Sequence, residues 1–445
     1  MNQKENRLII TLCLIVLSGV ANSLLFNVAL FEMMNGLEVT ASKISWVVIS
    51  YTLVIACGSI TYSKLASYFQ IKSLLIFGIS LFVTGSLIGY TTNDFIVVVL
   101  ARIIQAAGGS SFIALSMILT NQYLTFPKRN LALTLIGACL SLGSGIGFLL
   151  GGFFTHFWGW HSLFLLMSMA IFTLLGIILF VPSGYANHKK LTQPFDFLGF
   201  LYLLTFVVTF ILGVKLNGYL LIITVISVFF MGIHGKRQDV GIFMDLSVFR
   251  FYAFNRFLLL SFINSAAMVG IIFLFPLLAG QQFHVSALKT GFILAGISIF
   301  SFLLSFVIRP AITRIQGNGR LVVAVVLQFI GFLLLAIFGV NQFAVASVGV
   351  ALINISFTIL TIVINIDIPH TIKKEKSAMG LGIYNLINFL GMSFGPSIAS
   401  RILNVTSSFS LSFGFFVSLL LVALLLSCVS SIPVSSRKIK QSRQL

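Results

Sequence analysis

Acidic residues are scarce in this chain. Its 445 residues include nine Asp and Glu against 27 Lys and Arg, and charged residues make up only 8%. Hydrophobic residues account for 58%, and the mean hydropathy is +1.11. This composition excludes a soluble domain of ordinary size and is typical of a protein that crosses a membrane many times. The net charge of +18 would suggest nucleic acid in a soluble chain, but here the bases lie in short loops, so we expect no nucleic-acid partner.

Cysteine is also scarce, and its distribution excludes two kinds of site. Cys13, Cys57, Cys139 and Cys428 lie singly in apolar runs, without a CxxC pair or a regular spacing. The sequence therefore predicts neither a metal site nor a disulfide framework. Phosphate-binding and nucleophile motifs do not stand out, so we expect a protein that is not an enzyme and needs no cofactor.

Long apolar runs, in contrast, follow one another along almost the whole chain. The first extends from Leu8 to about Leu30 and is too long for the apolar region of a signal peptide, so we interpret it as a membrane span. Further runs lie near residues 45–63, 73–92, 95–118, 130–153, 162–182, 197–214, 218–233, 257–280, 290–308, 321–340, 343–365, 377–400 and 409–430. They predict an all-α polytopic membrane protein with fourteen transmembrane helices, grouped as six, two and six.

Polar segments and loop charges predict the domain organisation and the orientation. We expect an N-terminal six-helix bundle at 1–182, a hinge with two extra transmembrane helices at 183–256, a C-terminal six-helix bundle at 257–432 and a basic tail at 433–445. With the N-terminus inside, 22 bases fall on the cytoplasmic side, and the outside receives only four, Lys43, Lys215, Lys289 and Arg401. This bias predicts a plasma-membrane protein whose termini and 183–196 hinge are cytoplasmic.

One base lies inside a predicted span. Arg102 lies about two helical turns after the start of the apolar run from Phe95 to Ile118. On insertion scales, placing an arginine within a span costs roughly 2.5–3.5 kcal/mol of free energy. Gln105 and Gly109 share its helical face, which is polar or small as an inward face would be. We therefore expect Arg102 to face the protein interior and to bind backbone carbonyls or amide side chains such as that of Asn22. The alternative is an arginine that reaches the headgroups from the end of its span.

An internal repeat links the two six-span groups. Residues 143–148, GSGIGF, match residues 391–396, GMSFGP, and both lie in the fifth span of their group. Gly143, Gly147 and Gly151 form a smooth stripe that lets a neighbouring helix approach, although glycine is common in membrane helices generally. Gly391, Gly395 and Pro396 occupy the corresponding part of the second group. A parallel repeat of this kind predicts a site between two halves that rock against each other.

Several motifs together resemble a known family. Asn27 to Leu30, Trp46, residues 62–65 and 71–75, the run Arg102-Ile103-Ile104-Gln105 and the glycine-rich stretch 143–152 resemble motifs of the major facilitator superfamily. The chain is similar to its fourteen-span drug:proton antiporter branch and to the tetracycline exporters of the Gram-positive K and L types. The resemblance implies an exporter that works by alternating access between two pseudo-symmetric halves.

The departures from this family concern acids. The acid of the family's loop motif is replaced by Ser67, and the membrane carboxylates of the tetracycline exporters fall on Ser144, Met392 and a position near Ser23. A proton-coupled exporter needs a titrating group whose environment alternates. Glu32 and Asp367, near span ends, are the only possible substitutes that we identify, although ordinary boundary residues explain both. His156 and His161 could also titrate, but we favour interfacial anchoring by the aromatic residues between them.

Polar residues on shared faces predict what lines a cavity. As substrate-binding candidates we propose Asn22, Asn27, Arg102, Gln105, Ser144, Asn264, Asn354, Tyr384, Asn385, Asn388 and Met392. Hydrogen bonds between helices would explain the asparagines equally well. The surrounding surface is apolar and uncharged apart from Arg102, which suits lipophilic, neutral or anionic solutes.

Two classes of function remain open at this stage. The first is a monomeric exporter of a lipophilic compound, either drug-like or a lipid, with doubtful proton coupling. The second is a transporter fold that no longer transports and acts as a partner or sensor subunit. The missing acids favour the second, whereas Arg102, Gln105 and the glycine stripe favour the first.

Overall fold

The computed structural model describes residues 2–125, 128–181, 196–235, 246–314, 318–368, 371–372 and 377–428. The predicted hinge around Lys189 and Lys190 and the tail at 433–445 lie outside these residues. Within them the chain is all-helical, as expected. Acids fix some helix starts: Asp94, which is exposed, accepts a hydrogen bond from the Val97 N–H at 3.0 Å, and Asp196, which is buried, accepts one from the Gly199 N–H at 2.8 Å.

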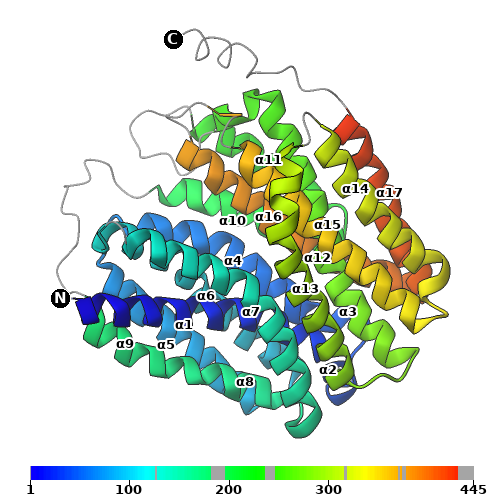
Figure 1. Cartoon of the computed structure of the whole chain (residues 1–445), viewed down its shortest axis with the longest axis horizontal. Helices are drawn as coiled ribbons and strands as arrows, with labels where there is room; N and C mark the ends of the chain where they lie inside the picture. The colour runs from blue at the N-terminus through cyan, green and yellow to red at the C-terminus, as the bar shows by residue number, and fades with distance from the viewer. Residues whose placement is uncertain are drawn as a thin grey trace.

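The helices form two large groups and a hairpin (Figure 1). The N-terminal half comprises α1 (Asn2–Val28), α2 (Leu30–Gly36), α3 (Ala41–Ile44), α4 (Trp46–Leu65), α5 (Ile71–Tyr90), α6 (Phe95–Tyr123), α7 (Lys128–Trp158), α8 (His161–Ser168) and α9 (Phe172–Phe180). The hairpin comprises α10 (Phe197–Lys215) and α11 (Leu220–His234). The C-terminal half comprises α12 (Tyr252–Gln281), α13 (Ala287–Arg314), α14 (Gly319–Leu334), α15 (Phe343–Asp367), α16 (Ser377–Thr406) and α17 (Phe409–Cys428).

The expected count of fourteen spans is not supported. Twelve segments of the described chain are long and apolar enough to cross a membrane. Helix α11, with 15 residues, is shorter than the roughly 20 that a bilayer requires. Helix α16 has the length, with 30 residues, but not the apolar composition, because residues such as Asn385, Asn388 and Ser393 interrupt it. The boundaries of the four predicted domains stay a prediction.

The fifth long helix of each half packs in the same way. Helix α7 packs against α1 of its own half and against α13 of the other half, while α16 packs against α12 and against α4. Close approach depends on glycine: a Cβ at Gly147 would lie 2.9 Å from the Ala21 carbonyl oxygen, and one at Gly391 would lie 2.5 Å from that of Phe262. The predicted glycine matches therefore coincide with equivalent helix contacts in the two halves.

The contacts across the two halves gather toward one end of the bundle. Thr52 and Ser393 hydroxyls lie 2.8 Å apart, and those of Ser45 and Ser400 lie 3.1 Å apart. A Cβ at Gly152 would lie 2.6 Å from the Ala287 carbonyl oxygen. Ser45 directly precedes α4, and the other residues belong to the first halves of α4 and α13 and to the second halves of α7 and α16. We call this end, which carries Ser45, Gly152, Ala287 and Ser400, the closed end.

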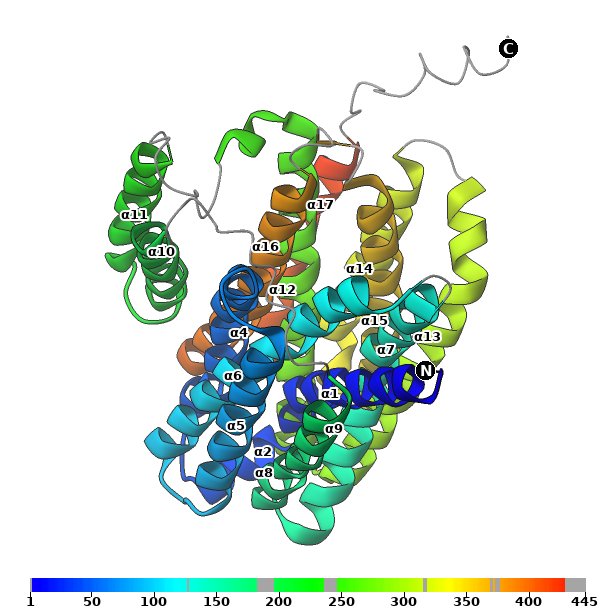
Figure 2. The ribbon, with the colours of Figure 1, turned by 90° about the vertical axis from the view of Figure 1, so that its left-hand side faces the viewer.

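The hairpin lies outside the two halves, along one of their seams. Helix α10 packs against both α16 and α4, and α11 packs against α10. Figure 2 shows the hairpin standing at the edge of the bundle beside these two helices. In the described part of the chain, the pair α7 and α13, which joins the halves elsewhere, has no comparable contact with the hairpin.

Candidate functional site

Arg102 is enclosed in the core of the N-terminal half. Its side chain on α6 is 1% exposed. Its Nε donates to the Val47 carbonyl oxygen at 3.2 Å, and Nη1 donates to Asn22 Oδ1 at 3.3 Å. The guanidinium also lies 4.2 Å from the ring centre of Phe26 and 4.0 Å from that of Tyr51. Arg102 thus faces the interior and binds the expected kinds of partner, and it does not extend to the headgroups.

Neutral groups extend this arginine contact into a network. Arg102 Nη1 donates to Gln105 Oε1 at 2.8 Å, and Gln105 Nε2 donates to the Ser86 hydroxyl at 2.7 Å. Together with Asn22, these residues connect α1, α5 and α6. Among the described residues, no carboxylate forms an ion pair with Arg102. The network therefore stabilises the packing of one half, and its predicted role in binding substrate stays a prediction.

The other predicted residues of this half lie apart from the network. The Asn27 amide donates within its own helix, to the Ser23 and Leu24 carbonyl oxygens at 3.1 and 3.3 Å. Ser144 is half-buried on α7, next to Gly143. Gly143, Gly147 and Gly151 face Val20, Ala21 and Leu25 of α1, in that order.

A second polar cluster lies between α12 and α16 of the C-terminal half. Asn388 Oδ1 accepts hydrogen bonds from the hydroxyls of Ser265, at 2.8 Å, and of Ser261. Tyr384, one turn before Asn388, lies beside the same groups. Ser261 was missed in the sequence, although its spacing of four residues from Ser265 places both on one helical face.

The remaining predicted residues of this half are dispersed around that cluster. Asn264 Nδ2 donates to the Thr361 hydroxyl at 3.3 Å, which links α12 to α15. Asn354 is buried on α15, and Met392 packs at the edge of the core. Asn385 is exposed on α16. Gly391 and Gly395 face α12, and Pro396 lies within α16 beside them.

The two possible coupling acids occupy different environments. Asp367 ends α15 and receives two hydrogen bonds from Arg320 Nη2, at 2.7 and 2.8 Å. Glu32, on α2 at the closed end, lies near the Ala287 N–H that begins α13 and near His156. One of its carboxylate oxygens is buried without a hydrogen-bond partner. Burial raises the pKa of the Glu32 carboxyl above its ordinary value.

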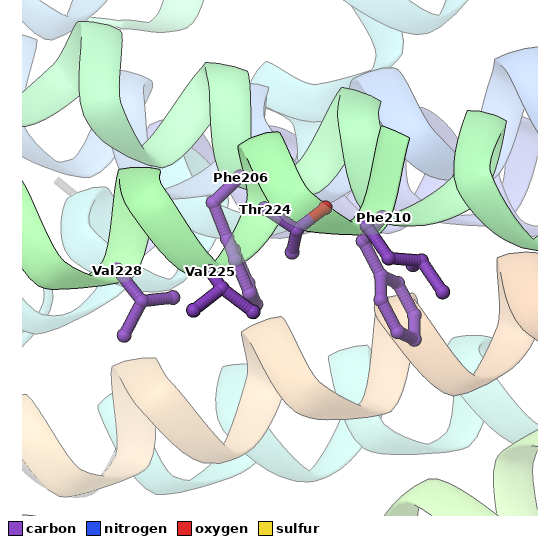
Figure 3. A pocket seen from close by; sticks show the side chains of 6 residues that line it. Phe206, Phe210, Thr224, Val225 and Val228 are labelled. Carbon is purple, nitrogen blue, oxygen red and sulfur yellow. The ribbon is translucent and has the colours of Figure 1, made fainter. Parts of the chain in front are cut away.

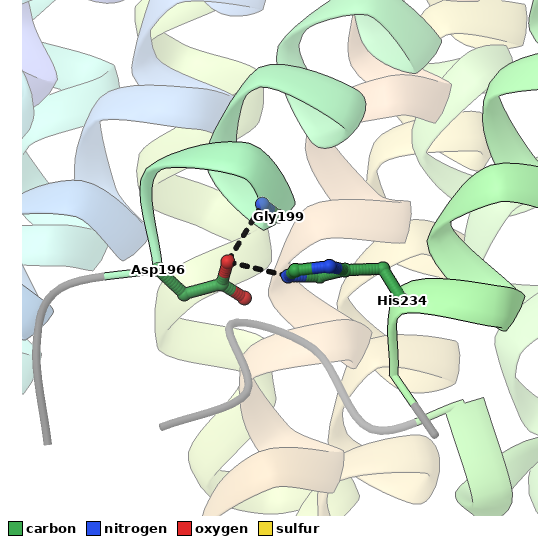
Figure 4. A network of polar contacts seen from close by, with 3 residues as sticks. All are labelled: Asp196, Gly199 and His234. Carbon is green, nitrogen blue, oxygen red and sulfur yellow. Dashed lines mark hydrogen bonds and ion pairs between the residues drawn. The ribbon is translucent and has the colours of Figure 1, made fainter. Parts of the chain in front are cut away.

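The hairpin carries two polar contacts that the sequence did not suggest. At one end, Asp196 Oδ1 lies 2.7 Å from His234 Nε2, so that the start of α10 is joined to the end of α11 (Figure 4). At the other end, Lys215 is 5% exposed and donates to oxygen atoms of Ser42, Ser45 and Ser400. The sequence placed Lys215 in an exterior loop because it lies between two predicted spans, whereas it is the last residue of α10 in the structure.

An apolar pocket lies along the same hairpin. Phe206 and Phe210 of α10 line it together with Leu221, Thr224, Val225 and Val228 at the start and middle of α11 (Figure 3). No residue of the predicted substrate-binding set belongs to this lining. Its apolar character is that expected of a surface in contact with hydrocarbon.

Comparison with known proteins gives a consistent family. The chain matches the Major Facilitator Superfamily over residues 11–396 and 258–444. It is 25% identical over 308 residues to Multidrug resistance protein 3 of Bacillus subtilis, with 66% of this chain and 59% of that protein covered. It is 23% identical over 299 residues to Riboflavin transporter RibZ of Clostridioides difficile, with 66% and 65% covered. The match thus spans less than two thirds of either relative.

Solved structures support the same architecture. A bacterial homologue of the human lysosomal transporter Spinster, in an inward-facing and unoccupied conformation, superposes with a TM-score of 0.66 at 13% identity. The superposition covers 96% of this chain and 97% of that one. At this identity the likeness concerns the fold alone.

Proposed function

Because the chain belongs to the Major Facilitator Superfamily, a family of transporters and not of enzymes, we propose that it exports lipophilic compounds across the plasma membrane by alternating access. The observation that carries this proposal is the equivalent packing of α7 and α16. Each joins helix one of its own half and helix two of the other half near the closed end. Rocking about such equivalent seams exposes a site between the halves to one side at a time.

The charge pattern predicts that the closed end faces outward. In that orientation Lys189, Lys190 and both termini are cytoplasmic, as the excess of bases on that side requires. The side opposite the closed end then admits the solute from the cell interior. We further propose that the chain acts as a monomer and resembles the drug:proton antiporter branch that includes the tetracycline exporters.

The substrate class follows from the residues around the predicted site. Asn264, Tyr384 and Asn388 offer neutral hydrogen-bonding groups amid apolar side chains. Arg102 is enclosed by its own half, so it supplies little charge to a solute in this conformation. Lipophilic solutes that are neutral or anionic suit such a site better than cations do. Multidrug resistance protein 3, by its name, is consistent with this class.

Proton coupling through membrane carboxylates is not part of this proposal. Ser144 and Met392 stand where the resembled exporters carry glutamates, and neither side chain titrates in an accessible range. Asp367, one of the two substitutes, is already paired with Arg320. We therefore expect weak or absent stimulation by a pH gradient, with transport driven by the gradient of the solute itself.

A flux assay in proteoliposomes tests these statements together. Efflux of lipophilic neutral and anionic fluorescent solutes is measured with and without an imposed pH gradient. The control is a Thr52→Cys/Ser393→Cys protein, whose disulfide should lock the closed end and abolish flux until it is reduced.

Strong stimulation by the pH gradient that persists in Glu32→Gln and Asp367→Asn variants would refute weak coupling. Ser144→Glu alone should not confer coupling, because Met392 leaves its partner position without an acid.

The second candidate is a transporter fold that no longer transports, retained as a partner or sensor subunit. The lack of the three expected carboxylates favours it. In the flux assay this alternative predicts no difference between the native protein and the disulfide-locked control for any solute, including lipids.

A further inference from the structure

Lys215 occupies an unusual position for a lysine at the end of a membrane helix. It is the last residue of α10, and its neighbours Leu216 and Asn217 are exposed. A lysine there would normally extend its side chain toward water and the headgroups. Instead, its side chain is buried and lies between the two halves, 5% exposed. Among the described residues, no carboxylate forms an ion pair with it.

Three oxygen atoms account for this burial. The Lys215 side-chain nitrogen donates to the Ser42 carbonyl oxygen at 2.7 Å, to the Ser400 hydroxyl at 3.2 Å and to the Ser45 hydroxyl. It also lies 5.1 Å from the ring centre of Trp46, at the start of α4. A lysine amino group offers up to three N–H donors, so each of them has an acceptor here.

These acceptors come from both halves of the molecule. Ser42 and Ser45 belong to the segment that leads into α4, whereas Ser400 belongs to α16. The Ser45 and Ser400 hydroxyls are themselves 3.1 Å apart at the closed end. Opening this end must separate α4 from α16, and the Lys215 nitrogen cannot then keep all of its acceptors.

A second contact attaches the same end of the hairpin to the C-terminal half. Arg401 Nη1 donates to the Val214 carbonyl oxygen at 2.6 Å, one residue before Lys215. Arg401 and Lys43 are the charged residues nearest in sequence to the serines that hold Lys215, and both are exposed. The opposite end of α10 is joined instead to α11, through Asp196 and His234.

We propose that the hydrogen bonds of Lys215 to Ser42, Ser45 and Ser400, which we call the clasp, stabilise the closed arrangement of this end. The α10–α11 hairpin, which carries Lys215, thereby takes part in gating. Lys215 is a positioning residue: it need not touch the solute, and it sets the balance between the closed and open arrangements of α4 and α16. The inference rests on the alternating access proposed above. Its test measures conformation directly, so it can fail or succeed whether or not a transported solute is found.

Labelling from outside intact cells provides the test. The four native cysteines are replaced, and Ser393→Cys is introduced, because Ser393 is 1% exposed and faces Thr52 across the seam. A membrane-impermeant maleimide then reports how often this end opens. Lys215→Met keeps the length of the side chain and removes its donors. We expect about tenfold faster labelling, as for the loss of one or two net hydrogen bonds.

Matched variants separate the clasp from other effects. Lys289→Met removes an exposed lysine at the same end and should leave labelling unchanged. Lys215→Arg retains donors and should label more slowly than Lys215→Met. Ser400→Ala removes the acceptor of the C-terminal half and should accelerate labelling by a smaller factor. Asn217→Cys, exposed in the hairpin turn, confirms that the reagent reaches this side.

Specific outcomes would overturn the proposal. It fails if the Lys215→Met protein is labelled at the native rate. It also fails if the rate increases caused by Lys215→Met and Ser400→Ala multiply in the double variant, because this would show that the two residues act independently. If Lys215→Met does not fold, as judged by its melting in detergent, a native labelling rate in a folded Ser400→Ala protein also overturns it.

Discussion

At the scale of single residues, Arg102 illustrates how a charge can be kept inside a membrane protein without an acid. Its donors are distributed over a backbone carbonyl and two amide side chains, and two aromatic rings cover its faces. The planar guanidinium suits this arrangement because its donors diverge at fixed angles. Each partner would be left unpaired in a dry core if the arginine were lost.

Replacing Arg102 should therefore destabilise the N-terminal half. Arg102→Ala leaves Asn22 and Gln105 without their shared partner, for which we expect a loss of about 3 kcal/mol in the free energy of unfolding. Arg102→Lys should also be impaired, because a lysine cannot reach all of these acceptors at once. Thermal melting in detergent measures both, with Arg129→Ala, which changes an exposed arginine at the start of α7, for comparison. Full stability and flux in Arg102→Ala would contradict a buried functional arginine.

Glu32 predicts a pH dependence of the closed end. Burial raises its pKa in the present arrangement, and opening would return it toward the ordinary value of a hydrated carboxyl. The closed arrangement thus binds the proton more tightly, so acidification through the raised pKa should favour closure, and alkaline conditions should favour opening. Ser393→Cys labelling, divided by the labelling of the exposed Asn217→Cys at the same pH to remove the thiol's own pH dependence, should be slower at acidic pH, and Glu32→Gln should abolish that difference. His156 is replaced by Gln in both proteins, because its charge also acts on Glu32.

At the scale of elements, α7 uses glycine on two different faces. Gly143, Gly147 and Gly151 meet α1 within the half, whereas Gly145 and Gly152 meet α13 across the seam. The first face can be packed permanently. The face that meets α13 must separate from it during the proposed transport cycle. The close approach of α7 to α13 therefore cannot depend only on side chains that interlock.

Gly147→Ala should destabilise the protein by about 1–3 kcal/mol, because the added methyl group meets the backbone of Ala21 and α1 must shift. Gly137→Ala, on the same helix, is the control: nothing lies within 4 Å of its added carbon, and alanine favours the helix. Melting temperatures in detergent compare the two. Equal melting temperatures would show that α1 and α7 are not held closely in the membrane.

The glycine repeat could be predicted from the sequence because close helix packing imposes a short, regular spacing of small residues. The contact of Arg102 with Asn22 was also expected, because no acid within a predicted span was available to pair with the arginine. The count of spans was not, because the apolar runs near residues 218–233 and 377–400 were both taken as spans, whereas α11 has only 15 residues and α16 carries polar residues such as Asn388 and Ser393. Ser261, Ser400 and Lys215 were missed for a similar reason: their roles depend on which helices become neighbours.

At the scale of the whole molecule, the orientation in the membrane is the prediction on which the transport direction depends. A single cysteine at position 189 should react with an impermeant maleimide only after cells are permeabilised, because the bases of this segment favour the cytoplasm. Asn217→Cys, placed on the opposite side of α10, should react in intact cells. Reaction of position 189 from outside would overturn the predicted orientation and, with it, the proposal that the side opposite the closed end admits the solute from the cell interior.

The position of the hairpin makes the two flanks of the transporter unequal. The α4–α16 seam and the α7–α13 seam are formed by equivalent pairs of helices, yet among the described residues α10 packs against the first pair and has no comparable contact with the second. Bilayer lipid can reach the second seam without displacing the hairpin. Under the proposed export of lipophilic compounds, we expect a solute dissolved in the hydrocarbon to reach the site between the halves more readily past α7 and α13 than past α4 and α16, where the hairpin lies.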